Sequence, residues 1–321
     1  MKLTELYSHV KNDLQQIEQE LERVICADHP ILEQASSQLL KAGGKRIRPV
    51  FVLLSARFGD YDFANARRVA AALETIHMAS LVHDDVIDNA ELRRGSQTVK
   101  AQYDNKVAMY TGDFLFAKAI ELMTNVHQIA AHQVLSYSMK EMCLGEIQQI
   151  KEQFDLEQNI RQYLRRIKRK TALLIAVSCQ LGAISSNTAI PLQQKLYRFG
   201  YNVGMSYQII DDILDFTGTE KELGKPAGGD LRQGNITLPV FYAMEMVPTL
   251  KEQIKAYYAS PSEEELQRIL AIIKKSGSIK RASKASQAYL AGALSIAQQF
   301  PAGQTKNSMI KIAKYIGRRK F

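Results

Sequence analysis

Residues 72–88 of this 321-residue chain read ALETIHMASLVHDDVID, and residues 203–216 read VGMSYQIIDDILDF. Both stretches repeat apolar residues at intervals of three and four, which is the spacing of a helix packed into a protein interior. Each stretch also contains aspartates in the spacing DDxxD. Two apolar helices with matching acidic clusters therefore dominate the predicted fold. The clusters consist of Asp84, Asp85 and Asp88, and of Asp211, Asp212 and Asp215.

On a helix, the first and fifth positions of DDxxD lie about 40° apart around the axis and about 6 Å apart along it. Asp84 and Asp88 therefore share one face, as do Asp211 and Asp215. Unpaired carboxylates in an apolar helix are costly, so nearby cations must compensate them. Carboxylate oxygens suit Mg²⁺, which is commonly shared with phosphate oxygens. Surface or N-cap acid clusters are the simpler alternative, but two copies of one spacing, both in apolar helices, favour a metal site.

The three-and-four spacing extends over most of the chain, and alternating strand patterns of useful length are absent. Gly and Pro residues fall between the predicted helices. We therefore expect an all-α protein that forms a single domain over residues 1–321, with ten or more helices. The predicted helices cover residues 3–24, 31–41, 48–58, 64–88, 107–126, 130–153, 160–184, 191–217, 237–246, 263–275, 279–299 and 306–316.

The composition is that of an ordinary globular protein, with 46% hydrophobic and 23% charged residues. This mix excludes a disordered chain, a collagen-like repeat and a disulfide scaffold. The three cysteines have no close paired spacing, so we expect no thiolate zinc site and infer a reducing compartment. The most apolar stretch, residues 172–184, is too short to cross a bilayer. The prediction is a soluble, cytoplasmic protein without a transmembrane segment.

The net charge of +9 is unevenly distributed along the chain. Residues 1–265 contain 30 basic and 33 acidic side chains, whereas residues 266–321 contain twelve Lys or Arg and no Asp or Glu. A basic segment of this kind suits an anionic partner or a partner subunit, or it is a solvated helix face. Because the segment has no recognisable reading motif or interleaved aromatic residues, we expect no nucleic acid partner. Peripheral contact with an anionic membrane stays open.

Basic residues near the acidic clusters supply cations of the kind that bind phosphate. Residues 41–49 read KAGGKRIRP, a glycine-hinged basic loop that opens a predicted helix and so forms an anion site. Taken singly, such basic loops are usually solvated. Their coincidence with two metal-type clusters indicates diphosphates held between magnesium and Lys or Arg. The further cations are Arg93, Arg94, Lys170 and Lys225.

These motifs resemble those of the trans-isoprenyl diphosphate synthase family. GGKRIRP, HDDVID, LRRG, KTALL, YQIIDDILD and GKPAGGD carry the resemblance over nearly the whole chain. The stretches HMASLVHDDVID, QGNITLP and YIGRRKF are most similar to the large catalytic subunit of bacterial two-component enzymes that make long-chain polyprenyl diphosphates. The resemblance implies the isoprenoid synthase fold around a central cavity, and condensation of an allylic diphosphate with isopentenyl diphosphate. It also implies a small non-catalytic partner subunit, component I.

In that family the two aspartate motifs face each other across the cavity and bind three Mg²⁺ ions, which hold the allylic diphosphate. His77 lies seven residues before Asp84 and on the same helical face, which favours the site over a core role. The resemblance implies metal ligation and catalysis by Asp84, Asp85, Asp88, Asp211 and Asp212, and metal ligation by Asp215. It implies allylic diphosphate binding by Arg93, Lys170, Thr171, Gln208 and Lys225, with Lys170 also catalytic. It implies isopentenyl diphosphate binding by Lys45, Arg48, His77 and Arg94.

Product length is expected to depend on the helix before Asp84. Small-product relatives place aromatic residues four or five positions upstream of that aspartate, and here those positions are Ser80 and Ala79. Ile76 and Leu73 lie about 12 and 16 Å deeper along the helix axis and border the expected floor of the pocket. Because nothing bulky closes the pocket at the upper level, the hypothesis is a long product of about C30 to C40. The resemblance implies an all-trans product of about heptaprenyl length.

Several alternatives to this prediction carry the same aspartates. A homodimeric long-chain synthase that acts alone, or a shorter geranylgeranyl-type synthase, would have both clusters. Terpene cyclases also use DDxxD in helical bundles, but they lack GGKRIRP and usually have an Asn/Ser/Glu pattern as the second motif. A non-catalytic subunit would be expected to lose aspartates, and none is missing. One departure from the family is Asn235, where many relatives have a Lys that contacts the allylic diphosphate.

Overall fold

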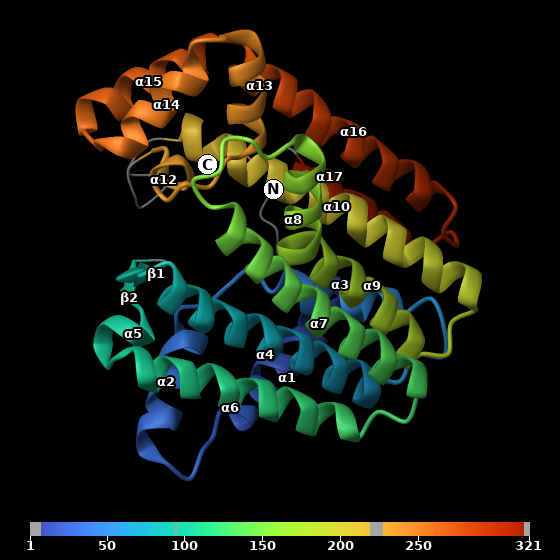
Figure 1. Cartoon of the computed structure of the whole chain (residues 1–321). Coiled ribbons are helices and arrows are strands. Elements are labelled where there is room, and N and C mark those ends of the chain that lie inside the picture. The colour runs from blue at the N-terminus through green and yellow to red at the C-terminus, as the bar shows by residue number, and fades with distance from the viewer. Residues whose placement is uncertain (1–7, 94, 219–226, 318–321) are drawn as a thin grey trace. The chain divides into compact units, whose positions relative to one another are not determined.

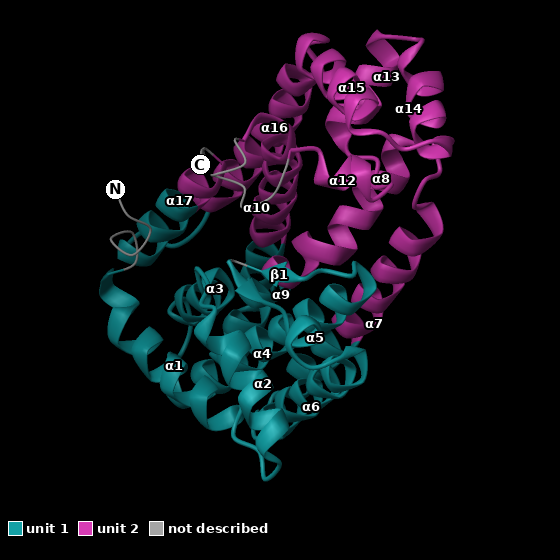
Figure 2. Cartoon of the chain, turned by 90° about the vertical axis from the view of Figure 1, so that its left-hand side faces the viewer, with its two compact units in different colours: residues 1–136, 177–197, 299–312 teal, residues 137–176, 198–298, 313–321 magenta. Residues whose placement is uncertain are grey.

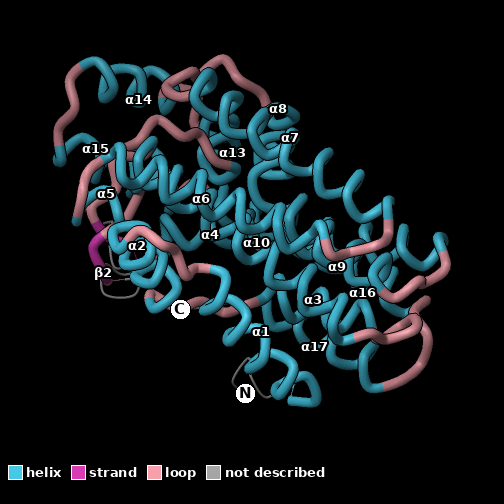
Figure 3. The backbone as a smooth tube through the Cα atoms, turned by 90° about the horizontal axis from the view of Figure 1, so that it is seen from below, coloured by secondary structure: helices cyan, strands magenta, loops and turns pink. Residues whose placement is uncertain are grey.

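The computed structural model describes residues 8–93, 95–218 and 227–317, and helices make up nearly all of the regular structure in these ranges (Figure 1). The all-α prediction, with ten or more helices, is confirmed. Short loops join most of the helices (Figure 3). Within the described ranges one pair of strands occurs, the antiparallel β1 (Leu92–Arg93) and β2 (Ser96–Gln97).

None of the helices in the described part of the chain is long and apolar enough to span a membrane.

The chain forms two compact units, which Figure 2 shows in different colours. Four of the five boundaries between them fall inside helices, so the chain passes between the units several times. The single domain over residues 1–321 therefore stays a prediction, as does the central cavity. Unit 1 comprises residues 1–136, 177–197 and 299–312, and unit 2 comprises residues 137–176, 198–298 and 313–321. The four helices are α7 (Ile129–Glu152), α9 (Leu173–Ser185), α10 (Ile190–Thr217) and α17 (Gln304–Gly317).

Unit 1 is built around α4 (Phe63–Ile87), which packs against α1 (Lys11–Val24), α3 (Ile47–Ala56) and α6 (Asn105–Thr124). The Asp62 side chain caps α4 by accepting a hydrogen bond from the Ala64 N–H. Residues 70–76 are buried without interruption, because neighbouring helices cover α4 on more than one side. Any charged side chain in this part of α4 must therefore find a partner inside the unit. Unit 1 also contains α2 (Pro30–Lys41) and α5 (Val99–Gln102).

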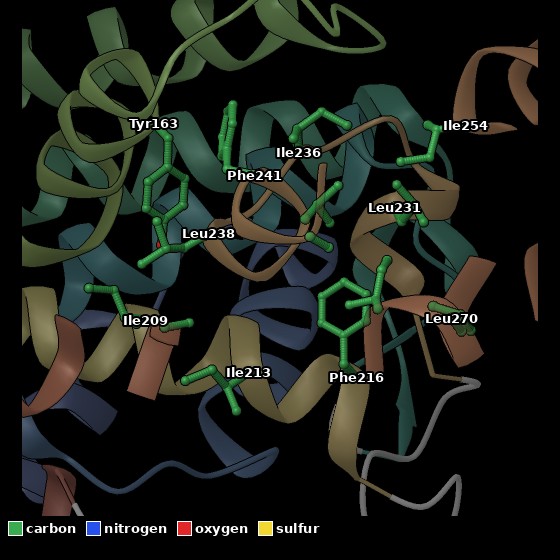
Figure 4. Packing of buried hydrophobic residues seen from close by; sticks show 14 of the residues in the cluster. Tyr163, Ile209, Ile213, Phe216, Leu231, Ile236, Leu238, Phe241, Ile254 and Leu270 are labelled. Atoms are coloured by element: carbon green, nitrogen blue, oxygen red, sulfur yellow. The ribbon is translucent and has the colours of Figure 1, made fainter. Parts of the chain in front are cut away.

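Unit 2 has an apolar core of its own, part of which Figure 4 shows. Tyr163, Ile209, Phe216 and Phe241 are buried in it. Asn159 begins α8 with a capping box, because its side chain and that of Gln162 each accept from the other's backbone N–H. The helices of this core, beside α10, are α8 (Ile160–Ile167), the π-helical turn η2 (Lys168–Ala172), α12 (Gly229–Arg232), α13 (Leu238–Met246), α14 (Leu250–Ala259), α15 (Glu263–Lys275) and α16 (Ser278–Gln298).

The structure departs from the predicted helices by one interrupted helix and three additional ones. Residues 160–184 were expected to form one helix, but η2 interrupts it with a wider turn between α8 and α9. We expected no helix between residues 247 and 262, yet α14 lies there between Pro248 and Pro261. It is only ten residues long and buries three of them, so its apolar spacing is too brief to stand out. The short helices α5 and α12 are likewise additions.

Candidate active site

The first aspartate cluster lies at the C-terminal end of α4. Asp84 and Asp88 are half-buried there, whereas Asp85 is buried. Arg93, returned toward α4 on β1, donates to both oxygens of Asp85: its Nη2 lies 2.6 Å from Oδ1 and its Nε 3.1 Å from Oδ2. Two parallel bonds from a guanidinium fork fix a carboxylate in orientation as well as in charge. The sequence prediction brought Arg93 to this cluster, and the structure pairs it with Asp85.

Burial decides the electrostatics of this pair. Removal from water raises the pKa of Asp85 above its usual range, and the hydrogen bonds and charge of Arg93 oppose that rise. The ionised form of Asp85 therefore depends on Arg93. Asp84 and Asp88 remain more accessible to solvent than Asp85, so they are the better placed carboxylates of this cluster for an external ligand.

The basic loop before α3 is fixed by an arginine that the sequence prediction did not single out. Arg46 adopts the left-handed conformation, with φ of 46°, and its guanidinium pairs with Glu18 and with the buried Glu74 of α4 at 3.1 Å. Burial of Glu74 on an apolar helix requires such a cation. Lys45 is exposed beside Arg46, and Arg48 is half-buried in the first turn of α3. The loop thus presents Lys45 and Arg48 from an anchored backbone.

The residues expected to limit product length lie along α4, on the N-terminal side of the cluster. Leu73, Ile76 and Ala79 are fully buried. Ser80 is half-buried and its hydroxyl donates to the backbone carbonyl of His77 at 2.9 Å. His77 is half-buried as well. The apolar side chains of Leu73, Ile76 and Ala79 agree with a hydrocarbon-facing role, which stays a prediction.

The second aspartate cluster lies near the C-terminal end of α10, within unit 2. Asp211 is half-buried and Asp212 is buried. The Tyr163 hydroxyl donates to Oδ2 of Asp212 at 2.6 Å, and the Gln208 amide donates to Oδ1 at 2.8 Å. The Thr171 hydroxyl donates in turn to the Gln208 carbonyl oxygen at 2.6 Å. The structure therefore brings together three of the predicted residues of this unit in one hydrogen-bond network.

The third aspartate of this cluster binds backbone groups. Asp215 is buried, and its two oxygens accept from the N–H groups of Gly229 and Asp230 at 3.2 and 3.1 Å. These residues begin the short helix α12. Asp215 therefore anchors the start of α12 to α10, which is a structural task in addition to the metal role predicted for it.

Burial also dominates the electrostatics of the second cluster. Burial is the main reason why the pKa of Asp212 is raised to about 6. The hydrogen bonds from Tyr163 and Gln208 oppose this rise. Burial raises the pKa of the Tyr163 hydroxyl well above its usual value, and the neighbouring Asp212 adds to this rise. The tyrosine therefore keeps its proton at neutral pH and acts as a hydrogen-bond donor to the carboxylate.

Lys170 and Thr171 are displayed by the π-helical turn η2. Lys170 Nζ pairs with Glu146 Oε2 of α7 at 2.8 Å, so the ammonium group has a defined position. Two glycines, Gly145 of α7 and Gly204 of α10, allow these helices to lie close to the turn. A Cβ on Gly204 would lie 2.5 Å from Ala172 Cα, and one on Gly145 would lie 2.8 Å from Arg169 Cβ. A wide turn of this kind is frequent at functional sites, where it redirects side chains.

The loop that contains Asn235 is held by a buried arginine. Arg166 of α8 is 5% exposed and donates to Glu152 at 2.8 Å and to the carbonyl of Ile236 at 2.6 Å. The Asn235 N–H donates to the carbonyl of Asp230 at 2.8 Å. The loop is thereby fixed by backbone contacts, and Asn235 itself brings no charge.

Two predicted residues, Arg94 and Lys225, lie outside the described residues. Conversely, Tyr163, Glu146 and Arg166 escaped the sequence prediction. Tyr163 had a usable signal, since it lies seven residues before Lys170, a spacing that places both on one face of a helix. Glu146 had none, because its contact with Lys170 bridges two helices.

The carboxylates of both clusters suit a hard divalent cation. Among the described residues, no group of three or more His, Cys, Asp or Glu is arranged to hold a metal ion by itself. Mg²⁺ is typically bound by one or two carboxylates together with substrate phosphates, so a closed protein cage is not required. The donor set fits Mg²⁺ ions that are shared with a diphosphate.

Comparisons with known proteins agree with this chemistry. Residues 29–275 match the polyprenyl synthetase family. The chain is 56% identical to heptaprenyl diphosphate synthase component 2 of Bacillus subtilis, over all of this chain and 92% of that protein. It matches the structure of heptaprenyl diphosphate synthase from Staphylococcus aureus with a TM-score of 0.93 at 44% identity, over 97% of this chain and 98% of that one.

A polyprenyl synthase from Caulobacter crescentus, solved in complex with calcium and isoprenyl diphosphate, also matches. The TM-score is 0.94 at 30% identity, over 99% of this chain and 98% of that one. The isoprenoid synthase fold expected from the sequence is confirmed by these neighbours. The chain belongs to the polyprenyl synthetase family and is a prenyltransferase.

Proposed function

We propose that the chain condenses an allylic diphosphate, farnesyl diphosphate being the expected primer, with successive isopentenyl diphosphates to a long all-trans polyprenyl diphosphate. The observation that carries this proposal is the complete pair of aspartate clusters. In each, the first aspartate is half-buried and the second is buried and held by protein donors. Both clusters are proposed to serve the same allylic diphosphate, through Mg²⁺ ions expected to number three.

The residues of the chain divide the work of the reaction. Bound Mg²⁺ would offset the negative charge of the departing diphosphate and so favour ionisation of the allylic carbon–oxygen bond. Lys170, oriented by Glu146, adds a positive charge on the same diphosphate. Lys45 and Arg48, on the anchored loop, bind isopentenyl diphosphate, whose alkene attacks the allylic cation and then loses a proton. The released diphosphate is the proposed base.

The product is proposed to have heptaprenyl length and to supply the side chain of a quinone. The relatives from Bacillus subtilis and Staphylococcus aureus carry heptaprenyl diphosphate synthase in their names, which supports this length. Leu73, Ile76 and Ala79 are buried and apolar along α4, which suits a wall that excludes water from a reactive cation.

We further propose that the chain acts in the cytoplasm as the catalytic subunit of a two-component enzyme. The Bacillus subtilis relative is named component 2, which supports a small component 1 as partner. A homodimer of the isolated chain, active alone, is the alternative.

The proposal is tested by incubating the purified chain with Mg²⁺, farnesyl diphosphate and isopentenyl diphosphate, with and without the small subunit encoded in the same organism. Chromatography of the dephosphorylated products gives their length. Heptaprenyl product only in the presence of the small subunit is expected. Heptaprenyl product from the chain alone would overturn the two-component proposal, and no condensation in either mixture would overturn the reaction.

The length proposal is tested on α4. Ser80→Phe or Ala79→Phe is expected to shorten the product to about geranylgeranyl length, one condensation beyond the farnesyl primer, because a ring would close the pocket near the first cluster. Ala79 is fully buried and Phe there risks overpacking, so the half-buried Ser80 is the safer position. Ser80→Ala is the matched control and should leave product length unchanged. Unaltered product length in both Phe variants would contradict the proposal.

A further inference from the structure

Tyr163 is a buried tyrosine of α8 that the reaction described above does not use. Its side chain is fully buried, and its ring lies 6.0 Å from that of Phe241. Figure 4 shows the ring among the apolar side chains of unit 2, reaching toward the helix that carries Ile209 and Ile213. A core role accounts for the ring. It does not account for the hydroxyl, because a phenylalanine at this position would fill the same apolar space.

The hydroxyl lies at one end of a chain of hydrogen bonds whose direction is fixed. Ionised Asp212 can only accept, so Tyr163 donates to its Oδ2 and Gln208 turns its amide nitrogen toward its Oδ1. This orientation leaves the Gln208 carbonyl oxygen to accept from Thr171. The rotamers of Gln208 and Thr171 therefore depend on where the Asp212 carboxylate is held.

Tyr163 is well suited to hold that carboxylate. The guanidinium carbon of buried Arg166 lies 5.8 Å from the centroid of its ring, and the capping box of Asn159 fixes the start of the same helix. A side chain enclosed in this way has little rotamer freedom, so its hydroxyl keeps one position. Hydrogen bonds from such outer residues orient ligating carboxylates and set their affinity for metal.

We propose that Tyr163 is a positioning residue for the second aspartate cluster: its hydroxyl holds Asp212 and, through Gln208, sets Thr171 for a diphosphate bound with Mg²⁺. This inference rests on the proposed function. Tyr163 touches neither substrate nor metal in this role, and acts through Asp212.

The chain offers a matched control in Tyr258 of the same unit. Its hydroxyl donates to the carbonyl of Leu231 at 2.9 Å, and its ring packs edge-on against Phe154. Tyr163→Phe and Tyr258→Phe each remove one hydroxyl and one hydrogen bond, the first from a fully buried position and the second from a half-buried one. Both variants are expected to fold, with melting temperatures a few degrees below that of the native chain. A merely structural hydroxyl would make the two variants behave alike.

The first measurement follows thermal stabilisation by inorganic diphosphate while Mg²⁺ is titrated. Tyr163→Phe is expected to raise the Mg²⁺ concentration for half-maximal stabilisation about tenfold, and Tyr258→Phe to leave it unchanged. Equal shifts in the two variants would overturn the inference about Tyr163. An absence of Mg²⁺-dependent stabilisation in the native chain would instead overturn the proposed function.

The second measurement asks whether Tyr163 acts through Asp212. Tyr163→Phe alone is expected to lower kcat about 10- to 100-fold, with the KM for isopentenyl diphosphate nearly unchanged. In a chain that already carries Asp212→Asn, the same substitution is expected to lower kcat by about twofold or less, because the carboxylate it serves is absent. A decrease of kcat by about 10- to 100-fold in the Asp212→Asn background would contradict the proposal that Tyr163 acts through Asp212.

Discussion

The two aspartate clusters share one spacing but compensate their buried carboxylates differently. In the first, Asp85 is balanced by a cation, the guanidinium of Arg93. In the second, Asp212 is held by two neutral donors, the Tyr163 hydroxyl and the Gln208 amide. Identical sequence motifs can therefore occupy different electrostatic environments. The partner of each aspartate, and not the spacing alone, determines what that aspartate can do.

The third positions differ as well. Asp88 caps the C-terminal end of α4 and is half-buried, whereas Asp215 is buried and accepts two backbone N–H groups. The first cluster thus has two accessible carboxylates and the second has one, Asp211. If the clusters act on one diphosphate, they contribute unequally to metal binding.

The largest effects are expected at the first position of each cluster. Asp84→Asn and Asp211→Asn should each lower kcat about 10²- to 10³-fold, because each removes a carboxylate that we propose to hold the Mg²⁺ that stabilises the transition state. Since both residues are half-buried, melting temperatures should change little. Steady-state kinetics and thermal unfolding check this. A near-native kcat in either variant would show that the reaction does not require that cluster.

A smaller effect, on stability, is expected at the second position of the first cluster. Arg93→Ala leaves buried Asp85 without its cation and should cost about 2 to 3 kcal/mol, a figure reduced because Arg93 is partly exposed. Adding Asp85→Asn should recover most of the loss, since a neutral amide needs no cation. Urea unfolding of the single and double variants measures both values. If the double variant is as unstable as Arg93→Ala, charge compensation is not the reason for the pair.

The smallest effect is expected at the third positions. Asp215→Ala leaves the N–H groups of Gly229 and Asp230 without their acceptor and should cost about 1 to 2 kcal/mol. Asp88→Ala, its counterpart in the first cluster, should cost about 0.5 kcal/mol or less. The same urea experiment compares them. Equal costs would show that the two third positions do not differ in structural role.

The sequence was sufficient for the helical class, both clusters and the family, because these depend on local spacing and on long shared motifs. It could not assign partners across helices. The pairing of Lys170 with Glu146, and of Arg46 with Glu74, joins residues that are distant in sequence and belong to no common pattern. The π-helical turn was missed for a similar reason, since Gly145 and Gly204, which lie close to it, belong to helices distant in sequence.

We propose that both clusters bind one diphosphate together with Mg²⁺. Isothermal titration calorimetry of inorganic diphosphate, in the presence and absence of Mg²⁺, tests it on the native chain, on Asp84→Asn and on Asp211→Asn. A single Mg²⁺-dependent binding event that either substitution weakens at least about tenfold is predicted. A Mg²⁺-dependent event of native affinity that survives in either variant would contradict the claim, because one cluster would then bind diphosphate without the other.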